Sequence, residues 1–282
     1  MVYRSVGLLG ACSQTNGAAP FSHTPAAAVE SAAKKPLDIY VTTYPNNTLT
    51  VYSASGSPIH TITAGLSSPQ GVAVDASGKA YVADLTSNSV TTYNEKGAQS
   101  KPTITKGINE PVGIVVDKNG KIYVTNQGNN TLTTYKPSGA QTTPTISGLN
   151  VPQSVAVDAN GKIYIANAGN STVTTYGADG SPTTPTITAA LDQPAGVGVD
   201  ATGKIYVSNY GNSTLTTYEA DGTQTTPTIT AGLDAPLFLA LGRGKIYVVN
   251  RAGGDLTTYK FDGTQAKPTI TGVVGGTGVA VH

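Results

Sequence analysis

The sequence has little of several residue types that characterise large classes of proteins. Its 282 residues include no tryptophan, one cysteine, one methionine and three histidines, and only 12% of them are charged. The single cysteine excludes an intrachain disulfide framework and a zinc site built on cysteines. No apolar run reaches about 18 residues, so the sequence predicts no membrane-spanning helix.

A surplus of charge of either sign is also missing. The chain has 17 Lys and Arg against 16 Asp and Glu, a net charge of +1. A nucleic-acid binder needs excess positive charge to displace counterions from phosphates, so we expect no nucleic-acid partner. The histidines, His23, His60 and His282, are widely spaced, and no Ser-His-Asp set, phosphate-binding glycine loop or HExxH motif occurs. The sequence therefore predicts no catalytic residues.

Glycine, proline, threonine and tyrosine are abundant instead, and an internal repeat accounts for them. A tyrosine within a short apolar strand recurs every 41 or 42 residues, at Tyr40, Tyr81, Tyr123, Tyr164, Tyr206 and Tyr247. A second tyrosine follows twelve residues after each, at Tyr52, Tyr93, Tyr135, Tyr176, Tyr218 and Tyr259. Two markers that keep the same phase through six copies predict six repeated structural units.

Each unit has the pattern of four short strands joined by glycine turns. The first strand, for example 113–117, carries a small residue in five copies, at Gly71, Gly113, Ser154, Gly196 and Gly278. It leads through an Asp-x-x-Gly-Lys hairpin to the second strand. The fourth strand carries a proline in five copies, at Pro102, Pro144, Pro185, Pro227 and Pro268. Because proline is confined to sheet edges, we place this strand outermost and the small-residue strand innermost.

These units predict an all-β fold, a six-bladed β-propeller of four-stranded antiparallel blades over residues 38–282. The regular pattern begins at a second strand, near residue 39, and ends at a first strand, near residue 281. The C-terminal strand is therefore expected to pair with the N-terminal blade and to close the ring, which removes two exposed sheet edges.

Two segments within this pattern resemble a known repeat. The residues PVGIVVD at 111–117 and IYVTN at 122–126 are similar to the NHL-type propeller repeat. The run YVTN at 123–126 also resembles the bacterial YVTN repeat. The resemblance covers about residues 39–282 and implies a propeller, but these families include scaffolds, sensors and enzymes, so it implies no single activity.

The first 37 residues lack the repeat. Residues 1–12 end in LGAC, which resembles a bacterial lipobox, and the lipidation site that this implies is Cys12, the single cysteine of the chain. The apolar run before it is shorter than a usual signal core. Residues 13–37 have the composition of a flexible linker. We expect an extracytoplasmic protein, either a bacterial lipoprotein held at the membrane by its lipid anchor alone or a secreted protein; the alternative is a non-functional leader with an incidental cysteine.

Positions that differ among the six copies are the candidate recognition residues. Two positions of the repeat differ in this way: the residue after the proline that precedes the first strand, and the residue after the second strand. They supply the predicted ligand-binding residues Tyr44, Gln70, Gln127, Gln153, Tyr210 and Arg251. Aromatic, amide and guanidinium groups suit a protein loop or a carbohydrate. The alternative is neutral drift in solvent-exposed loops.

Four second strands end in asparagine, at Asn126, Asn167, Asn209 and Asn250, and a fifth ends in Asp84. The structural interpretation is that these side chains hydrogen-bond the next turn. The alternative is a calcium site with the nearby carboxylates Asp84, Glu110, Asp192 and Asp234, which are one per blade. We expect no metal site and no cofactor, with calcium as the alternative.

Two further features complete the predictions. Lys79, Lys121, Lys162, Lys204 and Lys245 follow the hairpin glycines on the opposite face and are expected to be solvated charges. Phe238 replaces the small residue in one inner strand, where it is expected either to plug the axial channel or an interblade gap, or to form the floor of a ligand pocket.

The function expected from the sequence is a non-catalytic binding or scaffold module, a monomer that holds a protein or carbohydrate ligand on one propeller face. The alternative is a divalent-metal-dependent hydrolase or lyase of the gluconolactonase or streptogramin-lyase type.

Overall fold

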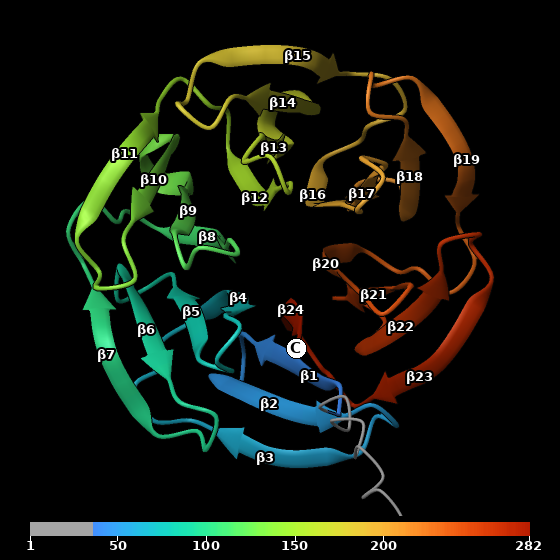
Figure 1. The fold of residues 1–282 in the computed structure, drawn as a ribbon. Helices are drawn as coiled ribbons and strands as arrows, with labels where there is room; N and C mark the ends of the chain where they lie inside the picture. Colours follow the sequence, from blue (N-terminus) through green and yellow to red (C-terminus); the bar gives the residue numbers. More distant parts are fainter. Residues whose placement is uncertain (1–35) are drawn as a thin grey trace, which may run out of the picture. The chain divides into compact units, whose positions relative to one another are not determined.

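The computed structural model describes residues 36–282, and both the predicted lipidation site Cys12 and the linker up to residue 35 lie outside that range. The described residues contain 24 β-strands and two 3₁₀ turns, η1 (Gln127–Asn129) and η2 (Ala168–Asn170). No helix in this range is long and apolar enough to cross a membrane. The strands form six antiparallel four-stranded sheets arranged around an axis (Figure 1), which confirms the predicted six-bladed propeller.

Blade 1 is β24-β1-β2-β3, and blades 2 to 6 each use four consecutive strands from β4 to β23. The innermost strands are β24 (Gly276–Val281), β4 (Pro69–Val74), β8 (Pro111–Val116), β12 (Pro152–Val157), β16 (Pro194–Val199) and β20 (Pro236–Gly242). The second strands are β1 (Asp38–Thr43), β5 (Ala80–Asp84), β9 (Ile122–Asn126), β13 (Ile163–Asn167), β17 (Ile205–Asn209) and β21 (Lys245–Asn250).

The remaining strands follow the same order. The third strands are β2 (Thr48–Ser53), β6 (Ser89–Tyr93), β10 (Thr131–Tyr135), β14 (Thr172–Tyr176), β18 (Thr214–Tyr218) and β22 (Asp255–Lys260). The outermost strands are β3 (Pro58–Ile62), β7 (Gln99–Ile104), β11 (Gln141–Ile146), β15 (Pro182–Ile187), β19 (Gln224–Ile229) and β23 (Gln265–Thr271). The five strands with a central proline are all outermost, as the sequence predicts.

The two ends of the described chain meet in blade 1. Strand β24 pairs antiparallel with β1, with Ile39 opposite Val281 and Val41 opposite Val279. The red and blue strands lie side by side in Figure 1. Backbone bonds of 3.0 and 3.1 Å join Asp38 and His282 in both directions. The predicted ring closure is therefore confirmed.

Small residues allow the inner strands to approach one another around the axis. A Cβ added to Gly113 would lie 2.4 Å from the carbonyl oxygen of Gln153, on the next inner strand. One added to Gly71 would lie 2.5 Å from the carbonyl oxygen of Val112. Both distances are shorter than a Cβ can accept, so the repeated glycine is required by backbone proximity between blades, as its place in the pattern predicts.

Hydrophobic packing between neighbouring blades forms the core. Between blades 1 and 2, for example, Leu49, Val51 and Ile62 pack with Val82 and the buried ring of Tyr93. At the outer rim, the turn glycine of each blade lies against the outer strand of the blade before it, as Gly139 lies against Pro102. The repeated glycine and proline are thus partners across the seams between blades.

The two tyrosine series have different structural roles. In the first series, Tyr81 donates a hydrogen bond to Asp75 of its own hairpin at 3.0 Å. In the second series, Tyr93 donates to the carbonyl of Ala64, in the loop that enters its blade, at 2.8 Å. Tyr135, Tyr218 and Tyr259 make the equivalent bond to Lys106, Ala189 and Ala231. Four tyrosines of the second series therefore fix the loops that enter their blades, on one face of the propeller.

Candidate functional site

One face of the propeller is built from the loops that follow the second and the outermost strands, and we call it the loop face. It consists of residues 44–47, 85–88, 127–130, 168–171, 210–213 and 251–254, and of residues 63–68, 105–110, 147–151, 188–193, 230–235 and 272–275. The opposite face, which carries the Asp-x-x-Gly-Lys hairpins, is the hairpin face. All six predicted ligand-binding residues lie in or beside the loops of the loop face.

The backbone of the loop face repeats in all six blades. In each blade, the residue after the second strand donates its N–H to a carbonyl just before the inner strand, at 3.0–3.2 Å. The donor and acceptor pairs are Tyr44 and Gly275, Leu85 and Ser68, Gln127 and Glu110, Ala168 and Val151, Tyr210 and Gln193, and Arg251 and Ala235. Six side chains of five residue types thus share one fixed backbone geometry.

The acceptor residues of these bonds have left-handed backbone conformations. Five of them are not glycine, and Val151, with a φ of 49°, is β-branched, for which this conformation is unfavourable. Their N–H groups are bonded by a side chain of the preceding blade: Asn130 Oδ1 accepts from Val151 at 2.8 Å, and Asn47 Oδ1 accepts from Ser68 at 2.7 Å. Asn88, Ser171 and Ser213 make the equivalent bonds in the next blades.

Sequence reasoning missed these bridging residues, although a signal was present. A short polar residue, Asn or Ser, ends the loop after the second strand in five copies, at Asn47, Asn88, Asn130, Ser171 and Ser213. The sixth copy has Gly254, whose carbonyl accepts from Val273 N–H at 2.9 Å. The seam between blades 6 and 1 therefore lacks a side-chain bridge of this kind.

The asparagines at the ends of four second strands hydrogen-bond the same loops from within the blades. Asn126 is fully buried, and its Oδ1 accepts the N–H of Asn109 at 3.1 Å while its Nδ2 donates to Thr133 Oγ1 at 3.0 Å. Asn167, Asn209 and Asn250 make the equivalent pairs of bonds. These bonds confirm that the asparagines have a structural role, but the predicted partner is wrong. Each Oδ1 accepts from the loop that enters the blade and not from the turn that follows the strand.

Asp84 is the exception among these strand-end residues. It is fully buried, and its carboxylate accepts hydrogen bonds from Ser67 N–H at 3.2 Å and from Thr91 Oγ1 at 2.5 Å. Burial raises the pKa of Asp84 to about 6, and the two hydrogen bonds only partly oppose that shift. The carboxylate is directed into the blade by these bonds and does not face the loop surface.

Three of the predicted ligand-binding residues lie exposed in adjacent blades. The side chain of Tyr210 in blade 5 is 38% exposed, that of Tyr44 in blade 1 is 42% exposed, and Arg251 in blade 6, between them, is also exposed. Val274 is 62% exposed in the loop that enters blade 1, where the neighbouring Gly275 bonds the N–H of Tyr44. We call Tyr44, Tyr210, Arg251 and Val274 the aromatic sector.

The three predicted glutamines lie elsewhere on the loop face. Gln153 Nε2 donates to Gln127 Oε1 at 2.9 Å, so the structure brings these two together at the seam between blades 3 and 4. Gln70, in blade 2, donates to the carbonyl of Ser68 at 3.4 Å. All three are half-buried. The six predicted residues therefore form an exposed aromatic sector and a more buried amide sector.

The position after the turn proline is not a recognition position in every blade. Gln70 and Gln153 reach the surface, but Val112, Ala195, Leu237 and Thr277 are buried at the equivalent position. Val112, Ala195 and Leu237 pack in one cluster with Phe238, although they come from three different blades. The variation at this position follows from packing across the axis, which the sequence interpretation did not separate from ligand recognition.

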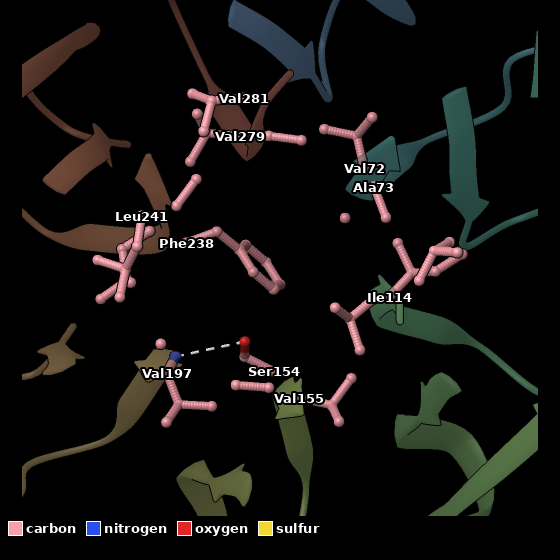
Figure 2. Close-up of a pocket in the computed structure, with 18 of the residues that line it drawn as sticks. Val72, Ala73, Ile114, Ser154, Val155, Val197, Phe238, Leu241, Val279 and Val281 are labelled. Atoms are coloured by element: carbon pink, nitrogen blue, oxygen red, sulfur yellow. Dashed lines mark hydrogen bonds between the residues drawn. The ribbon is translucent and has the colours of Figure 1, made fainter. Parts of the chain in front are cut away.

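Phe238 both plugs the channel and forms the floor of a cavity. Its ring projects toward the axis in Figure 2, and it is buried. A cavity of about 300 Å³ lies beside it, lined by the inner strands of all six blades. The lining includes residues 72–74 and 239–241 but not Gln70 or Leu237, so the cavity lies on the hairpin-face side of Phe238. The packing role predicted for Phe238 is therefore present, and the cavity beside it lies on the face away from the predicted site.

Most of the hairpin lysines join strands of their own blade and are not simply solvated. Lys79 Nζ donates to the carbonyl of Lys101, on the outer strand of its own blade, at 2.7 Å. Lys162, Lys204 and Lys245 bond Thr184, Thr226 and Lys267 in the same way. The ammonium of Lys121 lies 5.1 Å from the centre of the Tyr123 ring. The expectation of solvated charges is corrected by these contacts.

The carboxylates named as calcium candidates do not gather. No group of three His, Cys, Asp or Glu side chains within 36–282 is arranged to hold a metal ion. Asp192 and Asp234 instead use their backbone N–H groups to bond Asn209 and Asn250. His60 lies on the outer strand β3, and His282 is at the hairpin face near the carbonyl of Ala76.

Comparison with known families matches two blades. The family model described as the NHL repeat matches residues 109–135 and 149–176. These segments run from the loop before the inner strand through the third strand of blades 3 and 4. These two segments match the NHL repeat. The structure extends the same four-stranded unit to all six blades, so the NHL-type resemblance seen in the sequence is confirmed.

Solved structures of similar fold have different functions. A chain in the crystal structure of a nidogen/laminin complex superposes with a TM-score of 0.74 at 15% identity, covering 87% of this chain and 98% of that one. Virginiamycin B lyase from Staphylococcus aureus gives 0.64 at 12% identity, covering 83% and 80%. A protein of unknown function from Bacteroides caccae gives 0.70 at 12% identity, covering 87% and 98%.

These similarities show a common propeller fold, and at such identities they show nothing more. Comparison with curated protein sequences finds no match. The function of this propeller must therefore be argued from its own loop face.

Proposed function

We propose that the protein is a non-catalytic binding module that holds a protein ligand on its loop face, with the aromatic sector as the main contact. The observation that carries this proposal is the fixed backbone beneath six variable side chains, of which Tyr44, Tyr210 and Arg251 are exposed in adjacent blades. A rigid frame lowers the entropy lost when such side chains bind a partner.

The composition of the aromatic sector favours a protein ligand. Tyrosine and arginine are enriched in protein interfaces and at their energetic hot spots. Val274 adds exposed apolar surface next to Tyr44. On this side of the axis Val112, Ala195 and Leu237 pack around the buried Phe238, and the cavity beside Phe238 lies toward the opposite face. A broad and shallow surface of this kind suits a folded partner or its loop better than a small molecule.

The alternative, a metal-dependent hydrolase or lyase, has less support from the described residues. Asp84 is committed to two internal hydrogen bonds, and the other candidate carboxylates do not converge. One solved structure of the Staphylococcus lyase is a histidine-to-alanine variant described as catalytically inactive. The histidines of the part of this chain that the structure describes, His60 and His282, lie at the outer rim and on the hairpin face.

The test compares a loop-face variant with a matched variant of the hairpin face. Tyr44→Ser/Tyr210→Ser/Arg251→Ser removes the aromatic sector, and Lys96→Ser/Lys118→Ser/Lys136→Ser removes three exposed side chains from the opposite face. Proteins captured by the wild-type chain from an extracellular extract are identified, purified and titrated against each variant. We expect the loop-face variant to bind about tenfold or more weakly and the hairpin-face variant to bind like wild type.

Equal binding by both variants would contradict the proposal. A glycan array tests the carbohydrate alternative, and binding there that depends on Tyr44 and Tyr210 would replace the protein ligand by a sugar. A melting temperature that rises with calcium and falls again with a chelator would support the enzyme class instead.

A further inference from the structure

Blade 1 differs from the other five at its outer rim. Like the outermost strands of the other blades, β3 pairs with one neighbour among the described strands, and its other edge faces outward in Figure 1; the difference lies in its residues. The five other outermost strands have a central proline, at Pro102, Pro144, Pro185, Pro227 and Pro268. The equivalent residue of β3 is His60.

Contacts across the seams establish this equivalence. A Cβ on Gly139 of blade 3 would lie 2.6 Å from Pro102 Cβ and 3.4 Å from Ile104. One on Gly97 of blade 2 would lie 3.2 Å from the His60 ring and 3.0 Å from Ile62. His60 therefore takes the place of the proline in the same interblade contact.

The residue before this position also differs in blade 1. In the other blades it is lysine or threonine, at Lys101, Thr143, Thr184, Thr226 and Lys267. In four of these blades its carbonyl accepts the hairpin lysine. In blade 1 it is Ile59, which is 55% exposed, and Asp38 stands where the other blades have the lysine. Natural edge strands are protected by proline and lysine. β3 has no lysine, and its one proline, Pro58, is its first residue and leaves the centre of the strand without one.

Blade 1 is also almost free of charge. Asp38, at the hairpin-face end of β1, is its single charged side chain, and residues 39–74 and 268–282 contain no Asp, Glu, Lys or Arg. Each of the other five blades carries charges of both signs. Two such blades can meet without like-charge repulsion and without desolvating a charge, and depletion of charge is typical of interface cores.

We propose that β3 is a self-association edge, which pairs antiparallel with β3 of a second copy of this chain. A two-fold axis would bring the same edge of each copy together, so that the two four-stranded blades form one continuous sheet and Ile59 is covered. A second copy fits because the edge is uncharged in both partners and because the contact is isologous. This interface lies on the rim, apart from the aromatic sector, and it would replace the monomer expected from the sequence.

The test measures the association of the whole chain by analytical ultracentrifugation. Ile59→Lys introduces the residue that blades 2 and 6 carry at this position, and Thr143→Lys makes the same change in blade 3 as a matched control. His60→Pro restores the proline of the other five blades. We expect the wild-type chain to dimerise with a dissociation constant below about 100 μM. Ile59→Lys and His60→Pro should each raise this constant about tenfold or more, and Thr143→Lys should leave it unchanged.

Circular dichroism confirms that each variant is folded, so that a loss of association is not a loss of structure. A wild-type chain that is monomeric at about 100 μM would overturn the proposal, as would a dimer that Ile59→Lys leaves intact or that Thr143→Lys weakens equally. Binding of a monomer to phosphatidylcholine vesicles that depends on Ile59 would also overturn it, by assigning the edge to a lipid surface.

Discussion

Asp84 is a buried carboxylate at a position where four blades have asparagine, and this difference has a cost. Burial raises its pKa from 3.8 to about 6, so the folded protein binds a proton there more tightly than the unfolded chain does. The stability that this proton provides is present at low pH and is lost as the pH rises between these two values. At neutral pH the folded state therefore holds an unfavourable buried charge.

We predict that Asp84→Asn stabilises the protein at pH 7 by about 2–3 kcal/mol and changes it little below about pH 4. The amide would donate to Thr91 Oγ1, as Asn126 does to Thr133. Urea unfolding at the two pH values measures the effect, and Asp179→Asn, on an exposed turn, serves as a control that should show no such gain. A smaller unfolding free energy for Asp84→Asn at pH 7 would contradict the assignment.

Residue roles were predictable from the sequence where they depend on neighbours in the chain. A structural role for Asn126 was predictable because an amide ends the second strand in four copies. Its partner was not, because the bond goes to Asn109 in the loop that enters the blade and not to the turn that follows. The burial of Val112 beside Leu237 was not predictable from the sequence, because it depends on packing across the axis between blades that are far apart in sequence. Residues that pack across the axis and residues that could contact a ligand both differ among the six copies, so the sequence alone does not distinguish them.

At the scale of the element, the inner strand is the most constrained part of each blade. Its small residue lies against the backbone of the next inner strand, and hydroxyl groups bridge the same seam. Thr125 Oγ1 accepts the N–H of Gly113 at 2.7 Å and donates to the carbonyl of Gln153 at 3.1 Å. The order and pairing of all four strands were predictable, since glycine and proline mark the innermost and outermost positions in nearly every copy.

We predict that Gly113→Ala destabilises the propeller by about 1–3 kcal/mol, because its Cβ would meet the Gln153 carbonyl and Ser154 Cα. Thermal unfolding followed by circular dichroism measures the change. Ala140→Gly, on an exposed turn of the same blade, is the comparison and should have a much smaller effect. An unchanged melting temperature for Gly113→Ala would mean that the inner strands can separate without cost.

At the scale of the whole molecule, the ring depends on one strand from the far end of the chain. Strand β24 supplies the inner edge of blade 1 and contacts both neighbouring inner strands, β4 and β20. Thr277 of β24 donates to the carbonyl of Pro69 in blade 2 at 2.8 Å. That bond crosses the seam between blades 1 and 2. The seam between blades 6 and 1 is held by the packing of β24 against β20, without the side-chain bridge that the other seams have.

We predict that deletion of residues 276–282 lowers the melting temperature by more than about 10 °C, since it exposes the edge of β1 and opens the ring. A circular permutant that joins His282 to Pro36 by a short turn, with new ends at the exposed turn of residues 178–181, should keep the native melting temperature within a few degrees. Differential scanning calorimetry measures both. Equal stability of the truncated and intact chains would show that the ring does not need to close.

The repeated backbone bond beneath Tyr44, Tyr210 and Arg251 also has a consequence for how such a molecule can change. Because each of the six side chains stands on the same hydrogen-bonded support, and Leu85, Gln127 and Ala168 already occupy it elsewhere, substitution there leaves the architecture untouched. The residues that determine folding and the residues that determine ligand specificity are therefore different ones. New ligands can be acquired by substitutions at these six positions in different combinations. A library randomised at these positions alone should yield folded proteins almost throughout, which makes this propeller a natural display scaffold.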